Sequence, residues 1–227
     1  ILINMYWKDE GYLLSKNNFD ENSIIIESFT LEHGKCSGIV YGGNSRKNKK
    51  IIQIGNKILI NYKSKNENNI GYFAIELIKP ISPMFFDDKK RSICILTACS
   101  ILKILLPERQ LNKKIYNSFE NLLNNFNSDH WIRLYILWEL SLVKELGFEI
   151  NLSDKKSSLN TNNYTVGINN RTFKIPKLLL EHKIKNISKN EITEALIFNK
   201  NLLLQNFILP NRIKLPLSRN ILEKYFY

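Results

Sequence analysis

The sequence has few cysteines and no long apolar run, and these two absences exclude several classes of protein. It contains three cysteines, Cys36, Cys94 and Cys99, and none has the Cys-x-x-Cys spacing of zinc or redox sites. Three thiols cannot all pair, so we expect a reducing cytoplasm. The most apolar window, residues 93–106, contains Lys103 and is shorter than the ~20 residues that a membrane helix requires. The opening residues lack the basic start and apolar core of a signal peptide, so no membrane or secretory segment is expected.

Motifs of catalysis are missing as well. The pair Gly42-Gly43 is not followed by the Gly-Lys-Ser/Thr spacing of a nucleotide-binding phosphate loop. His33 and His130 have no neighbouring Cys, Asp or Ser pattern typical of nucleophilic or metal chemistry. A hydrolase that uses scattered Asp and Glu residues has no convergent motif in its favour. We therefore predict a protein that is not an enzyme and holds no cofactor or metal.

Acidic residues are outnumbered by basic ones. Lysine and arginine total 33 and aspartate and glutamate 21, which gives a formal net charge of +12. Such an excess favours polyanionic partners, nucleic acid or an acidic peptide. Abundant Asn, Lys and Ile are also what an AT-rich genome produces, so an inert basic surface remains an equal interpretation of the charge alone.

The distribution of the charge is more informative than its sum. Residues 44–66 contain no acid, so the fields of their cations add. These cations follow a glycine pair, which relaxes the backbone at the mouth of a predicted sheet, and they suit phosphate contacts. The candidate DNA-binding residues are Arg46, Lys47, Lys49 and Lys50, supported by Lys57, Lys63 and Lys65.

Five segments rich in β-branched and aromatic residues, separated by Asn, Gly and Asp, predict short strands. They are Tyr12–Leu14, Ser23–Phe29, Cys36–Tyr41, Lys57–Tyr62 and Tyr72–Leu77. Five such strands predict a small OB-fold β-barrel, of a type that commonly binds single-stranded nucleic acid. Residues 5–80 are therefore expected to form a nucleic-acid-binding OB-fold domain.

After Pro80 and Pro83 the pattern becomes helical, which places a domain boundary there. Asp87-Asp88 predicts the cap of a helix that runs to Leu105. Further helices are expected over 113–125, 129–146 and 191–206, and a polar, irregular insert at about 151–176. The predicted fold class is α+β, an N-terminal barrel followed by an all-helical C-terminal domain over residues 84–227.

Tyrosines of the barrel have two interpretations. Tyr62 and Tyr72 either stack on bases, a contact that typically contributes ~1 to 3 kcal/mol per base, or belong to the barrel core or rim. The core or rim is the favoured interpretation, and Tyr41 has the same two alternatives.

An ordered set of short motifs resembles the bacterial recombination mediator family RecO, in its alphaproteobacterial variety. The motifs keep their order from about Met5 to Phe226: Asp9-Glu10-Gly11, Phe29-Thr30, Glu32-His33-Gly34, Gly42-Gly43 before Ser45-Arg46, Gln53 with Gly55-Asn56, Gly71-Tyr72 with Glu76, Leu106-Pro107-Glu108-Arg109, Trp131 with Trp138-Glu139-Leu140, Leu146-Gly147-Phe148 and Leu217-Ser218-Arg219. No single motif is diagnostic, but the ordered set is fairly specific.

The resemblance implies an OB-fold and a helical domain without a catalytic centre. It implies a cytoplasmic, nucleoid-associated protein that binds single- and double-stranded DNA and anneals complementary strands. With RecR, such a protein helps RecA to replace single-strand-binding protein (SSB), whose acidic C-terminal tail it contacts. The alternative from the basic barrel alone is a generic OB-fold RNA-binding protein.

The sequence departs from the family pattern at a metal site. Many relatives carry four zinc-binding cysteines where this chain has residues 151–175, whereas no cysteine follows Cys99. Structural zinc normally needs four Cys or His ligands, and His182 alone cannot supply them. The helical domain is therefore predicted to lack the zinc site.

The SSB tail needs an apolar slot rimmed by cations, because its carboxylates and terminal aromatic residue must be met together. Arg133, beside the aromatic helix, and Lys200, on the last long helix, are the candidates. Relatives often place arginine just before the aromatic-Glu pair, where this chain has Ile136 and Leu137. The alternative is that both cations are simply exposed.

Overall fold

The computed structural model describes residues 5–65, 70–148, 165–168, 171–180 and 187–227. The chain divides into two compact units, Ile1–Asn117 and Ser118–Tyr227, which are described in turn. The predicted boundary, between residues 80 and 84, follows the barrel directly. The boundary between the two compact units lies further along the chain, after Asn117, because helix α2 (Lys89–Leu105) packs against the first strand, β1. None of the helices in the described ranges is long and apolar enough to cross a membrane.

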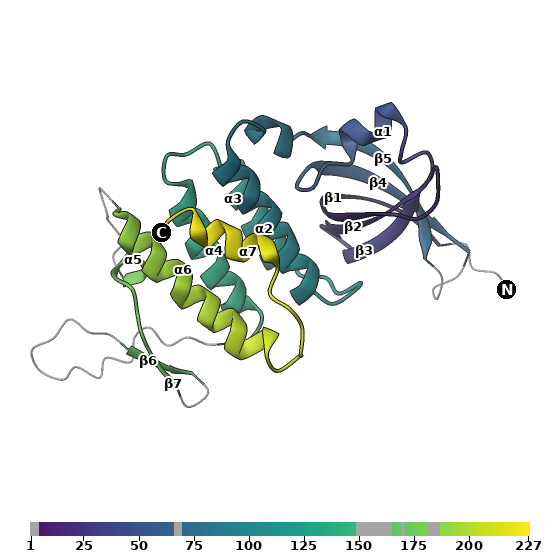
Figure 1. Ribbon diagram of the computed structural model, residues 1–227. Helices are drawn as coiled ribbons and strands as arrows, with labels where there is room; N and C mark the ends of the chain where they lie inside the picture. Colours follow the sequence, from purple (N-terminus) through teal and green to yellow (C-terminus); the bar gives the residue numbers. More distant parts are fainter. Residues whose placement is uncertain (1–4, 66–69, 149–164, 169–170, 181–186) are drawn as a thin grey trace, which may run out of the picture. The chain divides into compact units, whose positions relative to one another are not determined.

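Five strands close into a barrel in the order β1-β2-β3-β5-β4 (Figure 1). They are β1 (Met5–Asn18), β2 (Ile24–Thr30), β3 (Gly34–Val40), β4 (Lys57–Ser64) and β5 (Gly71–Lys79). β1 is long enough to pair with both β2 and β4, with an irregularity between Leu13 and Ser15, and β3 pairs with β5 in parallel. This closure confirms the predicted five-stranded OB-fold.

Alternation along the strands explains the barrel core. On β4, Ile58, Ile60 and Tyr62 are buried, while the residues between them are more accessible, as expected of a pleated sheet with one face on the core. Val40 and Phe73 bring the same apolar face from β3 and β5. The barrel is therefore filled by one cluster of interdigitated aliphatic and aromatic side chains.

One helix in this unit was not expected from the sequence. The run after Gly43, for which no helix was predicted, forms α1 (Arg46–Ile51) between β3 and β4. Ser45 begins it, because its side chain accepts a hydrogen bond from the Asn48 amide at 3.3 Å. Ile51 and the following Ile52 are buried in the barrel core cluster, so α1 is anchored to the barrel by its end.

Helix α2 completes the first unit. A 3-10 turn, η1 (Ser82–Phe85), precedes it, and Asp88 caps it by accepting hydrogen bonds from the amides of Lys90 and Arg91. The Nζ of Lys103 lies 2.8 Å from Glu27 of β2, which ties α2 to the barrel. The predicted helix and its cap are therefore confirmed.

The second unit is mainly helical. Its elements, with the helix that enters it, are α3 (Lys113–Asn124), α4 (Trp131–Glu145), the strands β6 (Thr165–Ile168) and β7 (Arg171–Lys174), α5 (Lys177–Leu180), α6 (Lys189–Leu203), a π-helical turn η2 (Leu204–Ile208) and α7 (Leu217–Lys224). β6 and β7 pair antiparallel. Most of the irregular insert expected at about 151–176 lies outside the described residues, and the part that is described is regular over these two strands. α7 was not predicted.

A buried ion-pair network joins α4, α6 and α7. Arg219 is 0% exposed, and its Nε and Nη2 atoms donate to the two carboxylate oxygens of Glu139 at 2.7 and 3.1 Å. Nη2 also donates to the Leu196 carbonyl at 2.6 Å, and Nη1 lies 3.4 Å from Glu223. Arg219 stands in the sequence near Arg212, Lys214 and Lys224, but it is a structural residue of the second unit.

Candidate nucleic-acid interface

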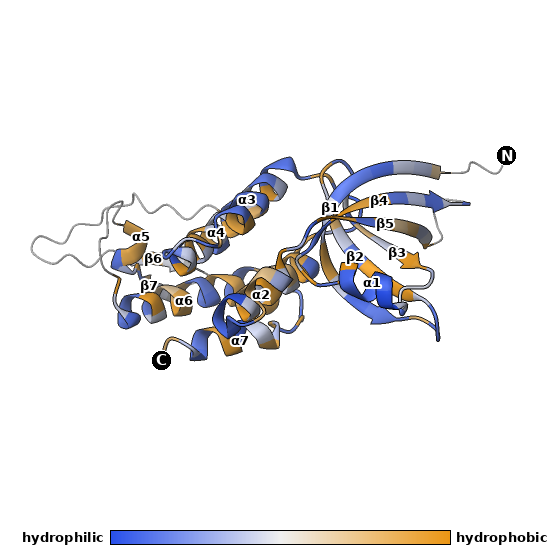
Figure 2. Cartoon of the chain, turned by 90° about the horizontal axis from the view of Figure 1, so that it is seen from above, coloured by the Kyte–Doolittle hydropathy of each residue, from blue (hydrophilic) through white to orange (hydrophobic). Residues whose placement is uncertain are grey.

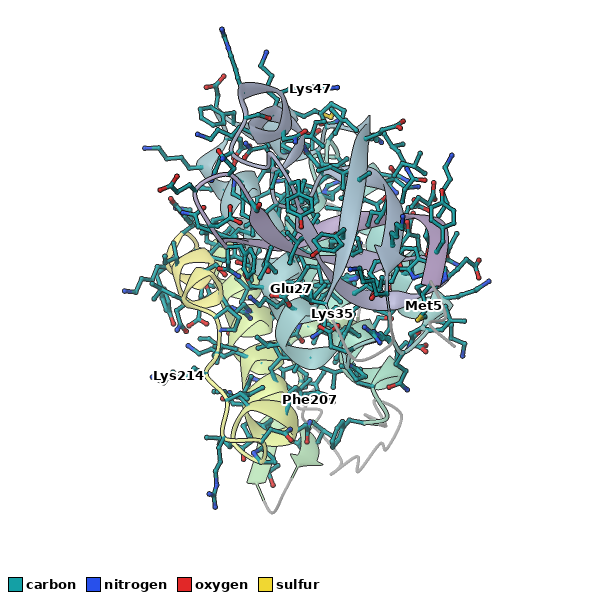
Figure 3. All side chains as sticks on the ribbon, turned by 90° about the vertical axis from the view of Figure 1, so that its right-hand side faces the viewer. Met5, Glu27, Lys35, Lys47, Phe207 and Lys214 are labelled. Carbon is teal, nitrogen blue, oxygen red and sulfur yellow. The ribbon has the colours of Figure 1, made fainter. Side chains whose placement is uncertain are left out.

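The four central candidate cations all stand on α1. The side chains of Arg46, Lys47, Lys49 and Lys50 are exposed, and the first turn of the helix contains no acid. Figure 3 shows Lys47 at an outer edge of the first unit, far from Lys35 and Glu27, and Figure 2 colours most of α1 hydrophilic. α1 is fixed at both ends, by the Ser45 cap and by buried Ile51. It therefore presents a compact group of positive charges from a defined backbone.

A polar groove runs beside this helix. Its volume is about 580 Å³. Lys49 of α1 and Lys16 of β1 line it together with Asn17, Asn18 and Asn44. The Nζ of Lys16 donates to the Ile52 carbonyl at 2.9 Å, which holds that ammonium in place. Amide and ammonium donors in one groove suit phosphate oxygens.

Lys57 differs from the other candidates. Its Nζ lies 2.6 Å from the Glu10 carboxylate and 5.8 Å from the centre of the Tyr12 ring. A carboxylate at this distance offsets most of the field of the ammonium group beyond the pair. We therefore place Lys57 in the barrel wall and leave it out of the interface developed below.

Lys63 and Lys65 are exposed at the end of β4. Lys63 pairs in register with Tyr72 of β5 on one side and with Tyr6 of β1 on the other. Residues that pair in register project from the same face of a sheet, so this lysine stands between two tyrosines.

The tyrosines separate into two groups. Tyr62 is 3% exposed and stacks on Trp7 with ring centroids 4.7 Å apart, so it belongs to the core, as the favoured interpretation had it. Tyr41 and Tyr72 are 63% and 39% exposed and stack on each other at 4.8 Å with a 16° interplanar angle. Hydrogen bonding to Tyr72 raises the pKa of Tyr41 above its ordinary value, so the Tyr41 ring stays neutral at physiological pH. An exposed aromatic pair of this kind is available to a ligand.

A second hollow, of about 390 Å³, lies by the start of β1 and is lined in part by His33. The Nδ1 of His33 lies 2.8 Å from Asp9, whose carboxylate also accepts hydrogen bonds from the amides of Glu10 and Glu32. Burial, followed by the charge of Glu108, raises the pKa of the nearby Cys36 thiol to about 12, so it is not a nucleophile at neutral pH. Asp9 serves here to order the turn between β2 and β3.

The two candidates for the SSB tail both lie in the second unit. Arg133 is half-buried on α4, and Lys200 of α6 has its Nζ 3.3 Å from Glu223, at the edge of the buried network. An apolar slot of about 330 Å³ in this unit is lined by neither of them. Its lining residues are Phe173, Lys174, Pro176, Glu194, Ile197, Phe198 and Asn201.

No group of three or more His, Cys, Asp or Glu side chains that could hold a metal ion occurs among the residues that the structure describes. The segment that corresponds to the zinc site of relatives, residues 151–175, falls largely outside those residues. The absence of zinc therefore stays a prediction from the sequence.

Comparison with known proteins gives one consistent family. A family model described as "Recombination protein O N terminal" matches residues 5–81, and one described as "Recombination protein O C terminal" matches residues 87–197. The chain is 34% identical over 151 residues to a protein named DNA repair protein RecO from Wolbachia pipientis subsp. Culex pipiens (strain wPip), a match that covers 66% of this chain and 62% of that protein. Proteins of the same name from Cereibacter sphaeroides (strain ATCC 17029 / ATH 2.4.9) and Jannaschia sp. (strain CCS1) are 34% and 30% identical, over 66% of this chain and 62% and 61% of their own lengths. The chain thus spans less than two thirds of the length of these relatives.

Proposed function

This chain belongs to the recombination protein O family, and from that premise we propose that it is a DNA repair mediator that binds single- and double-stranded DNA. In this proposal it anneals complementary strands and, with RecR, helps to load RecA onto single strands coated by SSB. The binding is electrostatic, and no bond of the DNA is broken.

The observation that carries the proposal is the cationic surface of α1. One short helix, between β3 and β4 of the barrel, exposes Arg46, Lys47, Lys49 and Lys50, and Lys49 also lines the polar groove. Cations that contact phosphates position DNA without reading its sequence. They also reduce the repulsion between two strands while leaving base edges free, which is what annealing requires.

A salt titration tests this assignment. Replacing the four α1 cations by alanine should weaken binding of a labelled single strand and lower the slope of log K against log salt by about 3, since each phosphate contact on single strands contributes about 0.7. Fluorescence anisotropy over a range of salt concentrations measures both quantities.

A control with the same change of net charge separates contact from general attraction. Four exposed lysines elsewhere are replaced by alanine: Lys89, Lys144, Lys177 and Lys189. This control should keep the parent's slope. If the α1 variant also keeps the parent's slope, or if both variants lose it equally, α1 does not hold the phosphates.

The alternative, a generic OB-fold RNA-binding protein, uses the same basic barrel. Competition between matched RNA and DNA oligonucleotides distinguishes the two functions, because a repair mediator should prefer DNA. A second test is binding of an acidic SSB-tail peptide, which only the repair mediator should bind. A double variant, Arg133→Ala with Lys200→Ala, that binds this peptide as tightly as the parent would exclude those two cations from the peptide site.

A further inference from the structure

The outer face of the barrel carries a row of exposed side chains, in which Tyr6 joins the candidates Lys63 and Tyr72. Tyr6 of β1, Lys63 of β4 and Tyr72 of β5 are paired in register across three neighbouring strands. Their neighbours along the strands, Trp7 and Tyr62, face the core cluster. Because successive side chains of a strand alternate between faces, the three paired residues all project outward.

Tyr41 extends this row beyond β5. It follows the end of β3 and stacks on Tyr72 at 4.8 Å. At the other end Tyr6 is 67% exposed, and its hydroxyl donates to Asn61 at 3.3 Å, so its ring lies along the sheet rather than away from it. Ala74, which pairs with Asn61, is small and leaves the space beside the rings open. We call Tyr6, Tyr72 and Tyr41 the tyrosine row.

The charges around the tyrosine row are positive. Lys63 stands between Tyr6 and Tyr72, and Lys8 projects outward two residues beyond Tyr6; both lysines are exposed. Acidic side chains begin farther along the same face, at Glu10, which is paired with Lys57, and at Glu76 of β5. The rings and the cations thus alternate over the same part of the sheet.

We propose that the tyrosine row stacks on unpaired bases of single-stranded DNA while Lys8 and Lys63 contact the intervening phosphates. This inference rests on the proposed function and adds to it a strand type and a set of residues other than those of α1. Tyrosine suits the role because it offers a rigid, amphipathic ring that stacks on any base. In a duplex the faces of the bases are already stacked on one another, so the row should favour single strands.

An oligothymidylate and its abasic counterpart, with the same number of phosphates, test the inference on the parent protein. The parent should bind the abasic strand at least about 25-fold more weakly, since that strand loses every stacking contact and each contributes ~1 kcal/mol or more. The double variant Tyr6→Ala, Tyr72→Ala should bind the oligothymidylate about 25-fold more weakly than the parent, with an unchanged salt slope. It should bind the abasic strand as the parent does.

Phe86→Ala is the matched control, because Phe86 is an 83% exposed aromatic side chain elsewhere in the same unit. It should leave binding to both strands unchanged. Lys63→Ala should instead lower the salt slope by about 0.7, the share of one phosphate contact.

The outcomes distinguish this inference from the proposed function. If the parent binds both strands equally, or if the double variant binds the oligothymidylate as the parent does, the tyrosine row does not stack on bases, even where the α1 variant is impaired. If the parent ignores single strands at low salt, the proposed function fails together with the inference. Should the double variant fold poorly, the comparison of the two strands on the parent still refutes the inference if both strands bind equally.

Discussion

Replacing Arg219 by methionine tests the account of the second unit most directly. The side chain of Arg219 is 0% exposed, and its guanidinium is shared between Glu139, Glu223 and the Leu196 carbonyl. Burial alone disfavours the charged form, but Glu139 outweighs it and raises the pKa of Arg219 above its ordinary value. A raised pKa means that the stabilisation is fully present at every pH below the ordinary value, so it is constant across the neutral and acidic range as far as this group is concerned.

The magnitude follows from what the substitution leaves behind. Glu223 keeps Lys200 at 3.3 Å and the Tyr227 hydroxyl at 2.8 Å. Glu139, also 0% exposed, keeps the Tyr135 hydroxyl at 2.8 Å but loses its bidentate cation. Leaving a buried charge without its ionic partner typically costs about 3–5 kcal/mol, out of the roughly 5–15 kcal/mol by which a whole domain is stable. Arg219→Met should therefore unfold at markedly lower urea concentration than the parent.

Urea unfolding followed by circular dichroism measures this loss. The double variant Arg219→Met, Glu139→Leu should recover part of it, because replacing both partners of a buried pair by apolar residues is often neutral, whereas the Tyr135 hydroxyl and the Leu196 carbonyl lose a hydrogen bond. Lys214→Met, which removes an exposed cation of the same unit (Figure 3), should be close to the parent. A cost below about 1 kcal/mol for Arg219→Met, the range of exposed pairs, would refute the argument, and so would a double variant as unstable as the single one.

Two further predictions concern groups away from the interface. Burial raises the pKa of Cys36 to about 12 and that of Cys99 well above its ordinary value, and Cys94 is buried too. Ellman's reagent at about pH 8 should therefore label none of the three thiols of the native protein and all of them in urea. Rapid labelling of the native protein would contradict this. Hydrogen bonds from the amide and hydroxyl of Ser188 lower the pKa of Glu191 in the capping box of α6, so this stabilisation is present above the ordinary carboxyl pKa and is lost as pH falls through the lowered one. Ser188→Ala should cost about 1 kcal/mol at neutral pH and less in acid, whereas a difference from the parent that does not change with pH would contradict the role of the carboxylate.

The barrel could be predicted from the sequence because its strands alternate strongly, whereas α1 could not. Residues 46–50 contain no apolar position, so no helical period is visible, and the two isoleucines that anchor the helix come at and just after its end. The cap at Ser45 is the one local signal that was available. The candidate cations were nevertheless identified, because a run without acids is visible whatever its backbone conformation.

Arg219 shows why charge patterns mislead at chain ends. Its surroundings, with Arg212, Lys214 and Lys224, read as a basic tail, yet it is the buried member of the set. The indication lay 80 residues earlier, where Glu139 interrupts an apolar helical face and so requires a buried cation. Sequence reasoning about α4 and about the tail separately could not join these two residues.

The first strand of the barrel, predicted over Tyr12–Leu14, runs over Met5–Asn18, and Tyr6 of the tyrosine row was missed for that reason. Residues 5–10 alternate between half-buried or buried and exposed positions up to Lys8, but Asp9 then occupies a buried position and breaks the apolar pattern. Asp9 can be buried because the amides of Glu10 and Glu32 donate to its carboxylate and the Nδ1 of His33 lies 2.8 Å from it. Because the charged Asp9 stands at a buried position of β1, the sequence pattern did not predict the part of the strand that carries Tyr6.

Two glycines among the motifs that suggested the family fix the barrel backbone. A side chain at Gly11 would lie 2.7 Å from the Phe29 carbonyl, and Gly34, at φ +68°, lies against the backbone of Gln110, so both positions need glycine for reasons of packing. Arg46 and Tyr72 belong to the same set of motifs but have exposed side chains. Core packing does not account for these two exposed residues. Each of them lies in one of the two surfaces proposed to bind DNA, α1 and the tyrosine row. The glycines therefore bear on the fold, whereas the α1 and tyrosine variants test the two proposed DNA-binding surfaces.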